Sequence, residues 1–156
     1  MKLKSKDYIL VGIQAAIFML YIFDLQILQL SFPQLIKDAA LIVSILGWII
    51  VLVAILQLNR NLSPFPSPKA DSKLVQNGLY KYIRHPVYFG ILIGLGGIAI
   101  YSLSGYRVIL TLALYVLFDI KSIYEEKLLM TKFPGYRDYR KKTGRFFPRI
   151  KKPHKS

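Results

Sequence analysis

The chain has 156 residues, of which 54% are hydrophobic, and its mean hydropathy is +0.40. This length favours a single domain, and the composition is more apolar than that of an average soluble domain. The chain has no cysteine, which excludes disulfides and thiolate chemistry, and only two histidines, His85 and His154, so we expect no zinc site. The net charge is +14, but no recognisable nucleic-acid-binding module accompanies it, so we expect no nucleic-acid partner.

Four apolar stretches predict an all-α integral membrane bundle of about four transmembrane helices. They cover residues 8–30, 39–58, 86–104 and 106–124, and the last, which carries three charged residues, is the weakest. About 20 such residues span the hydrocarbon core of a bilayer as a helix. The first stretch is longer than the apolar core of a typical signal peptide, and no small-residue cleavage site follows it, so we expect a membrane helix there.

The basic residues gather on one side of these predicted spans. Of the 22 Lys and Arg residues, only Lys37 and Arg107 fall in the loops after the first and third spans. Positive charge accumulates in the cytoplasmic loops of membrane proteins, so we expect both termini and the 59–85 loop in the cytoplasm. The basic tail "RKKTGRFFPRIKKPHKS" (140–156) favours contact with anionic lipid headgroups.

The segments around the third and fourth spans have distinct patterns. Three alternating prolines predict an extended, non-helical segment at 59–73, and a loop of this length is usually functional or disordered. We expect the third span to begin at Pro86, which suits the first position of a helix. The fourth span continues as a helix beyond the bilayer as far as "FPG" (133–135), and a short interfacial helix and an extended tail follow it.

Polar side chains interrupt the apolar pattern in "GLYKYIRHPVYFG" (78–90), directly before the third span. One interpretation is a membrane rim, with an aromatic belt of tyrosines and an arginine that reaches to the headgroups. The other is a site. Pro86 pushes His85 toward an extended conformation, so the chain breaks there and frees backbone groups that a polar ligand can bind.

Two adjacent acids, Glu125 and Glu126, follow the fourth span in a strongly basic part of the chain. They can form a salt-bridged helix face, because Lys121 lies one turn before Glu125. They can also be part of a site.

Two further features have open interpretations. The glycines at 90, 94 and 97 favour helix packing over a tunnel wall. Asp24 is either a functional intramembrane acid or a residue near the outer headgroups.

Taken together, "LVQNGLYKYIRHPVYFG" (74–90) and "EEKLLMTKFPGYRDYRKKTGRFFP" (125–148) resemble the isoprenylcysteine carboxyl methyltransferases. They also resemble the wider group of membrane methyltransferases that includes the phospholipid N-methyltransferases. The resemblance covers roughly residues 57–148, whereas 1–56 match only as hydrophobic spans. The residues that carry it are Leu74, Val75, Gly78, Tyr80, Arg84, His85, Pro86, Tyr88, Gly90, Glu125, Glu126, Tyr136 and Tyr139.

This resemblance implies a membrane enzyme that uses S-adenosylmethionine as its methyl donor. It divides the single domain into an N-terminal helix pair (1–58), a cofactor-binding catalytic part (59–148) and the last residues of the basic tail (149–156), and it implies an inner membrane of bacterial or archaeal type. The catalytic residues would be Arg84 and His85. The cofactor would lie against Lys73, Leu74, Val75, Gly78, Tyr80, His85, Pro86, Tyr88, Glu125 and Glu126.

The acceptor implied is a lipid-like or small apolar molecule that reaches the cytoplasmic face from the bilayer, with a prenylcysteine-type carboxylate among the candidates. Arg84 would orient such a carboxylate through two hydrogen bonds, whereas an amine acceptor would need His85 or a glutamate to remove its proton. Three alternatives stay open: a phospholipid N-methyltransferase, an NADPH-dependent membrane reductase of similar shape, and a non-catalytic anchor that binds anionic lipid. Nothing in the sequence indicates the oligomeric state.

Overall fold

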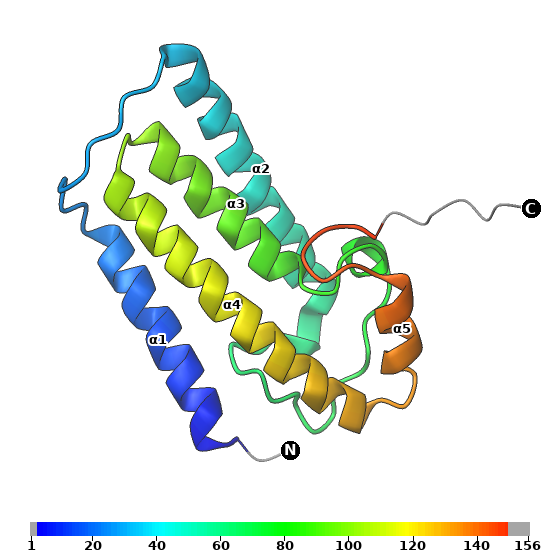
Figure 1. The fold of residues 1–156 in the computed structure, drawn as a ribbon. Coiled ribbons are helices and arrows are strands. Elements are labelled where there is room, and N and C mark those ends of the chain that lie inside the picture. Colours follow the sequence, from blue (N-terminus) through cyan, green and yellow to red (C-terminus); the bar gives the residue numbers. More distant parts are fainter. Residues whose placement is uncertain (1–2, 150–156) are drawn as a thin grey trace, which may run out of the picture.

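The computed structural model describes residues 3–149 as five α-helices and two short 3₁₀ turns (Figure 1). Within this part of the chain there are two isolated β-bridges but no strand, so the predicted all-α class is confirmed. The end of the predicted tail, at 149–156, lies outside the described residues, apart from Arg149. The helices are α1 (Ser5–Ile22), α2 (Gln34–Leu58), α3 (Pro86–Tyr101), α4 (Gly105–Lys132) and α5 (Tyr136–Lys142), and the 3₁₀ turns are η1 (Asn59–Asn61) and η2 (Gly78–Lys81).

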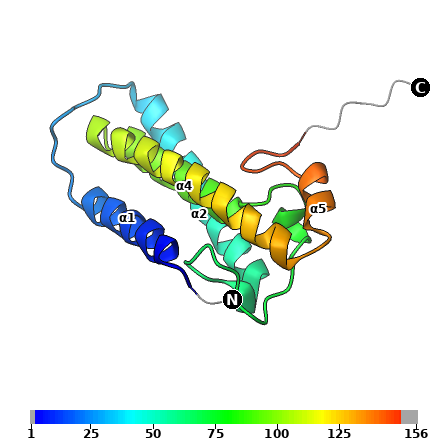
Figure 2. The same ribbon diagram turned by 60° about the horizontal axis from the view of Figure 1, so that its bottom comes forward.

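The four long helices lie side by side in the order α2, α3, α4 and α1 (Figure 1). The last part of α4 extends beyond α3 and packs against α5. The loop between α2 and η2 crosses the same end of the bundle (Figure 2). The chain therefore places its Pro-rich loop, η2, the end of α4 and α5 together at one end of the bundle.

The first helix is shorter than the sequence predicts. α1 ends at Ile22, whereas the apolar stretch continues to residue 30. The reason is that residues 23–33 dock on the turn between α3 and α4: the Leu30 N–H donates to the Leu103 carbonyl at 2.7 Å, and the Gly105 N–H donates to the Leu28 carbonyl at 2.7 Å. The prediction of a span over 8–30 was therefore wrong at its end.

Asp24 lies in this docked segment, at the end of the bundle opposite α5. Its carboxylate accepts a hydrogen bond from the Ser104 hydroxyl at 2.8 Å and pairs with Arg107 at 3.3 Å. Ser104 also caps α4, because its hydroxyl accepts from the Arg107 N–H at 3.2 Å. These contacts give Asp24 a structural role, which is to fasten the segment after α1 to the start of α4.

The glycines of α3 form a packing surface against α2, as their spacing predicts. A Cβ atom added at Gly47 would lie 2.4 Å from the Gly94 nitrogen, and one added at Gly97 would lie 2.5 Å from the Ala40 carbonyl oxygen. The Ser44 hydroxyl donates to the Gly94 carbonyl at 2.8 Å across the same contact. Small residues thus let the two backbones approach closely, as is common between membrane helices.

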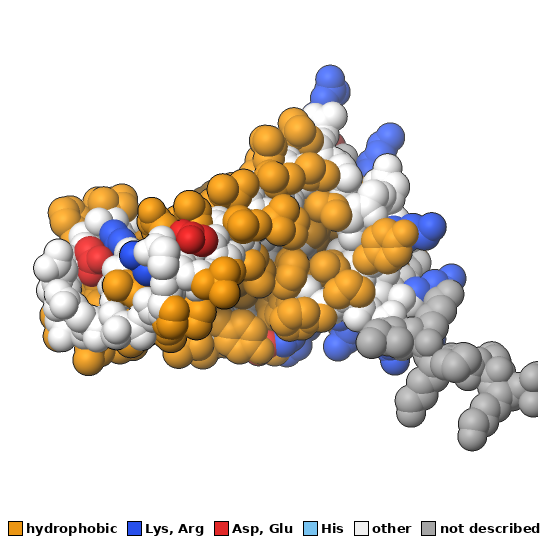
Figure 3. All heavy atoms as spheres, turned by 90° about the horizontal axis from the view of Figure 1, so that it is seen from above, with side chains coloured by type: hydrophobic (Ala, Val, Ile, Leu, Met, Phe, Trp, Pro, Cys, Tyr) orange, Lys and Arg blue, Asp and Glu red, His pale blue; other side chains and the backbone are white. Residues whose placement is uncertain are grey.

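Large apolar side chains cover much of the outer surface of the bundle (Figure 3). On α2, for example, Leu35 is 80% exposed and Leu56 is 68% exposed. By length and hydropathy, α1 and the segment Gln34–Asn61 can each cross a membrane, whereas α3 is a shorter apolar helix of 16 residues. The number of transmembrane helices, four, therefore stays a prediction.

Replacing Gly47 with alanine is expected to disrupt the contact between α2 and α3. The added methyl group meets backbone atoms of α3 that cannot rotate away, so Gly47→Ala should cost roughly 2 kcal/mol or more of stability. The matched control is Gly12→Ala on α1, where an added Cβ has no neighbour within 4 Å. Thermal unfolding of both variants in detergent checks this, and equal melting temperatures for the two would contradict it.

Candidate functional site

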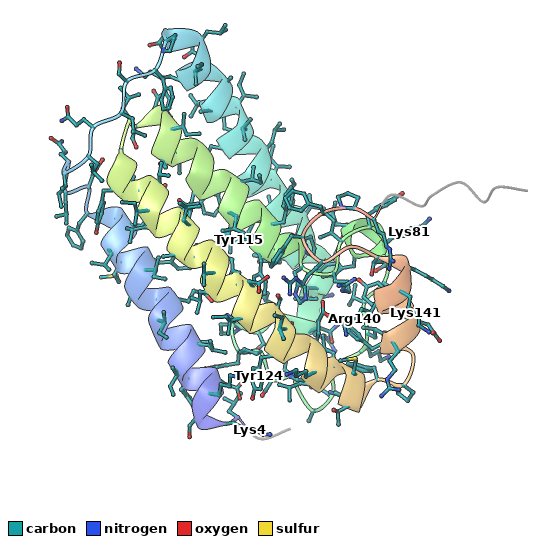
Figure 4. The ribbon with its side chains drawn as sticks, in the orientation of Figure 1. Lys4, Lys81, Tyr115, Tyr124, Arg140 and Lys141 are labelled. Carbon is teal, nitrogen blue, oxygen red and sulfur yellow. The ribbon has the colours of Figure 1, made fainter. Side chains whose placement is uncertain are left out.

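A buried carboxylate, that of Glu126, joins three segments of the chain. Its side chain is 4% exposed and lies on the part of α4 that follows the predicted fourth span. Arg84 donates from Nε to Glu126 Oε1 at 2.8 Å, and His85 Nε2 lies 3.2 Å from the same oxygen. Arg140, which lies between α5 and α4 in Figure 4, pairs with Oε2 at 3.1 Å. One acid thus connects α4, the break before α3, and α5.

The charge of Glu126 is stabilised by its partners. Burial raises the pKa of this carboxyl group, but hydrogen bonds from His85 and Arg84 and the charges of both residues outweigh burial, so the pKa lies below its usual value. The group is therefore ionised near neutral pH and can only accept hydrogen bonds. It follows that His85 Nε2 is the donor in its hydrogen bond to Glu126.

The break before α3 is held by the chain itself. The N–H groups of Arg84 and His85 donate to the carbonyls of Gly144 and Arg145, at 2.9 and 3.1 Å, and the Gly144 N–H donates to the Tyr82 carbonyl at 3.1 Å. These N–H groups thus need no polar ligand as a partner. His85 then forms the N-cap of α3, and Pro86 is the first residue of the helix, as predicted.

Glu125 lies beside Glu126 but faces a different set of groups. The Tyr88 hydroxyl donates to Glu125 Oε2 at 2.9 Å, and His85 Nδ1 lies 3.9 Å from the same oxygen. The His85 ring stacks on the Tyr88 ring with a centroid distance of 5.4 Å, and Tyr88 in turn stacks on Phe118 at 4.5 Å. Glu125 remains 26% exposed, so its carboxylate is available to a ligand, whereas that of Glu126 is enclosed.

A pocket of about 100 Å³ lies against Glu125, His85 and Arg84. Its polar lining includes these three residues, Tyr80 and Lys73, together with Asn61, Ser63 and Ser72 of the Pro-rich loop, and a smaller pocket of about 80 Å³ also contacts Tyr88. The remaining walls come largely from the Pro-rich loop, the end of α4 and α5. They include Leu58, Phe65, Pro66, Pro68, Leu74, Val75, Leu129, Phe133, Tyr136 and Tyr139.

The Pro-rich loop is fastened at both ends of this wall. The carboxylate of Asp7 on α1, which is fully buried, accepts from the Ser67 hydroxyl at 2.7 Å and from its N–H at 3.1 Å. Lys132 on α4 donates to the Ala70 carbonyl and to the Ser72 hydroxyl, at 2.9 and 2.8 Å. The loop therefore has a defined position over the pocket.

Lys121 contributes to the same attachment rather than to a salt bridge with Glu125. Its ammonium group donates to the Pro64 carbonyl at 2.9 Å and to Gln14 at 2.5 Å. The salt-bridged helix face that the sequence allowed for Glu125 and Lys121 is thus absent from the ion pairs of the described residues.

Tyr139 holds the η2 turn against α5. Its hydroxyl donates to the Tyr80 carbonyl at 2.5 Å, and burial raises the pKa of Tyr139 to about 12. The hydroxyl therefore keeps its proton at neutral pH and remains a donor. The turn itself needs glycine, since Gly78 has a φ of +57°.

The structure brings most of the predicted site residues to the two pockets. Those that line them are Lys73, Leu74, Val75, Tyr80, Arg84, His85, Tyr88 and Glu125. The other three lie behind this surface: Glu126 fixes Arg84 and His85, Pro86 starts α3, and Gly78 forms the turn. Sequence reasoning missed Asp7, Arg140 and the apolar wall from the loop and α4, although the alternating prolines did mark the loop as functional.

Comparison with known proteins gives a family match and several relatives. Residues 36–135 match the family described as phospholipid methyltransferase. Over 85 residues, the chain is 33% identical to the nickel-cobalt-cadmium resistance protein NccN of Alcaligenes xylosoxydans xylosoxydans, and 31% identical to the cobalt-zinc-cadmium resistance protein CzcN of Cupriavidus metallidurans. Each match covers 54% of this chain but only 40% and 39% of those proteins.

A solved structure extends the likeness to almost the whole chain. The eukaryotic intramembrane Ras methyltransferase ICMT, an isoprenylcysteine carboxyl methyltransferase, matches with a TM-score of 0.67 and 25% identity. The match covers 96% of this chain and 55% of that one. Although the two bacterial relatives are named for metal resistance, no group of three His, Asp or Glu side chains in residues 3–149 is placed to hold a metal ion.

Replacing Glu126 with glutamine is expected to destabilise the protein in a pH-dependent way. Loss of the charge leaves Arg84 without its buried partner, which should cost roughly 3 kcal/mol at neutral pH. Because the folded-state pKa of Glu126 is lowered, its stabilisation is present above the unfolded-state value and is lost as pH falls through the folded one. The gap in melting temperature between wild type and Glu126→Gln should therefore shrink in acid.

The matched control for this prediction is Asp138→Asn, which removes an exposed acid whose ion pair with Lys141 lies at the surface. Such pairs contribute roughly 1 kcal/mol or less. A constant gap for Glu126→Gln at every pH, or a loss at neutral pH no greater than that of Asp138→Asn, would contradict the account.

Proposed function

This chain belongs to the phospholipid methyltransferase family, and we propose that it transfers a methyl group from S-adenosylmethionine to a lipid-like or small apolar acceptor at the cytoplasmic face of a membrane. The family match and the likeness to ICMT confirm the predicted methyltransferase resemblance and the integral membrane bundle. The donor, the acceptor and the orientation in the membrane are our proposals.

The observation that carries the proposal is the convergence of two distant motifs at one pocket. Arg84, His85 and Tyr88 come from the break before α3, and Glu125 comes from α4 after the apolar hairpin. An apolar loop wall closes the opposite side. A pocket with apolar walls and a few converging polar groups is the usual form of a cofactor site.

The residues at the pocket fit the chemistry of S-adenosylmethionine. The partly exposed carboxylate of Glu125 suits the two hydroxyl donors of a ribose, and Leu74, Val75 and Phe133 offer apolar surface for an adenine. Tyr80 offers an aromatic ring to a cationic sulfur, whereas the ring of Tyr88 already stacks on His85 and Phe118. When bound, this cofactor supplies a methyl group on a positively charged sulfur, which is the activated group that such a reaction needs.

The residues of this chain contribute mainly by holding groups in place. Glu126 fixes Arg84 and His85, and Tyr88 fixes Glu125, so the polar wall of the pocket is ordered before a ligand enters. Methyl transfer in line needs positioning above all and no covalent enzyme intermediate. The Pro-rich loop, held by Asp7 and Lys132, covers the same space.

Two classes of acceptor remain, and the contacts of Arg84 and His85 bear on them. Arg84 already donates from Nε to Glu126, and from Nη1 to the carbonyls of Thr143 and Arg140. Its guanidinium is therefore largely committed, and its role in orienting an acceptor carboxylate stays a prediction. His85 lines the pocket and bonds to Glu126 through Nε2, so Nδ1 is the ring nitrogen that would take a proton from an amine acceptor. An amine is thus the second candidate.

The charged residues of the pocket lining can be compared with what the alternative function, an NADPH-dependent reductase, would need. The 2′-phosphate of NADPH would meet the acid Glu125 but also the cations Lys73 and Arg84 in this lining, so it is the family match that favours the methyltransferase over the reductase. The cytoplasmic orientation rests on the basic residues, which gather at the end that holds the site, as the blue side chains at one end of Figure 3 illustrate.

Replacing Glu125 with glutamine is expected to weaken binding of S-adenosylmethionine about 10- to 100-fold, because a hydrogen bond to a charged group contributes roughly 1.5–3 kcal/mol. Titration of the purified protein by calorimetry measures this. Asp71→Asn serves as a control, since Asp71 is an exposed acid of the same loop region that does not line the pocket.

Two results of this titration would count against the proposal. Absence of binding to the wild type at millimolar ligand would contradict the donor. Equal binding by wild type, Glu125→Gln and His85→Ala would contradict the assignment of the site, while the family would stand.

A further inference from the structure

A second and larger hollow lies beside the site and shares the wall residue Tyr139 with it. This groove measures about 600 Å³ and lies between η2 on one side and α5 with the start of the tail on the other. Three of its lining residues are cations from three separate segments: Lys81 on η2, Lys142 at the end of α5, and Arg149. We call it the basic groove.

The positive charge of the basic groove is not neutralised by an acidic residue in its lining. Asp138 is the one acidic residue in the groove lining, and it pairs with Lys141 at 3.3 Å. A further hollow of about 390 Å³, separate from the basic groove, also contacts Arg149. It continues the positive surface around α5, with Arg137, Arg140 and Lys141 in its lining. Arg149 itself is positioned by a hydrogen bond from Nη1 to the Lys141 carbonyl at 2.6 Å.

The aromatic residues next to the basic groove indicate its depth in a membrane. Tyr82 lines the groove and is 58% exposed. Phe147 is 66% exposed and packs edge-on against Phe89, in the first turn of the apolar helix α3. Exposed aromatic rings at the end of an apolar helix are typical of the headgroup layer. The groove therefore opens where lipid phosphates lie.

We propose that the basic groove binds the phosphate of an anionic membrane phospholipid, with Lys81, Lys142 and Arg149 as its ligands. In Figure 4, Lys81 on η2 and Lys141 on α5 lie on the same outer side of the bundle, away from α1. This inference does not depend on the identity of the methyl donor or acceptor. It goes beyond the predicted role of the basic tail (140–156), which contains Lys142 and Arg149, because it adds Lys81 on η2 and assigns the three cations to one groove.

The bound lipid would also touch the frame of the catalytic cluster. Thr143 lines the groove, and its carbonyl accepts a hydrogen bond from Arg84. Tyr139 separates the groove from the pocket and holds the Tyr80 carbonyl. A phospholipid in the groove is thus seated on the residues that fix the break before α3.

The test uses the purified full chain in detergent micelles and native mass spectrometry. The protein is titrated with phosphatidylglycerol and, separately, with phosphatidylcholine of the same acyl chains. We expect phosphatidylglycerol to bind at least about 10-fold more tightly. The triple variant Lys81→Gln, Lys142→Gln, Arg149→Gln should lose about 100-fold, since each cation near the surface contributes about a factor of five.

The matched control removes three exposed cations that do not line the groove, as Lys4→Gln, Arg60→Gln, Lys127→Gln. It should bind phosphatidylglycerol as the wild type does. Should the triple variant unfold, the single variant Lys142→Gln, expected to lose about 5-fold, takes its place. Equal losses in the groove variant and the control would overturn the proposal, as would equal binding of the two lipids by the wild type.

Discussion

The buried carboxylate of Glu126 is the interaction on which the site depends. Three cationic or hydrogen-bonding side chains from two other segments meet it, and each of those segments also lines or supports the pocket. A buried acid without partners would be strongly disfavoured. Packing α4 against η2 and α5 therefore requires Arg84, His85 and Arg140 to contact Glu126 together. These contacts also fix the positions of the residues that line the pocket.

This constraint explains why the two motifs of the sequence are far apart. The apolar hairpin of α3 and α4 only has to bring its two ends to the same side of the bundle, and the close glycine contacts with α2 fix where α3 lies. The tail contributes backbone carbonyls at Gly144 and Arg145 that hold the break before α3. The site is thus assembled at the ends of the helices, where backbone groups of distant segments bond to one another.

Much of the fold could be predicted from the sequence, because apolar length and helix signals are local. Pro86 marked the start of α3, and the helical spacing after residue 120 marked the continuation of α4 beyond the predicted span. The end of α1 could not be predicted from hydropathy, since residues 23–30 are largely hydrophobic apart from Asp24 and two glutamines, yet they find partners on the turn between α3 and α4.

The site shows the same division between local and distant signals. The adjacent acids and "RHP" identified the polar wall, but the partners of Glu126 are distant in sequence, and Arg140 is one of many basic residues there. Asp7 gave no signal either, because it follows a basic N-terminal stretch typical of an interface, yet its carboxylate is fully buried against Ser67. A contact across 60 residues leaves no local pattern.

The pocket and its loop indicate how a cofactor would enter. Sites for molecules of this size usually enclose roughly 300 Å³ or more, whereas the pocket beside Glu125 measures about 100 Å³. Binding of a molecule of that size would require the Pro-rich loop to move outward, against its hydrogen bonds to Asp7 and Lys132. The polar wall, in contrast, is fixed by Glu126 and stays in place.

The central claim is that the Glu126 cluster arranges a site for methyl transfer. The most direct measurement incubates membranes that contain the protein with S-adenosylmethionine labelled at its methyl carbon and counts label in the lipid extract. The account predicts transfer by the wild type and by Asp71→Asn, and a loss of about 100-fold or more in His85→Ala and Glu126→Gln, the size expected when a group that positions or moves a proton is removed. Transfer by Glu126→Gln at the wild-type rate, or none by the wild type above membranes that lack the protein, would contradict it.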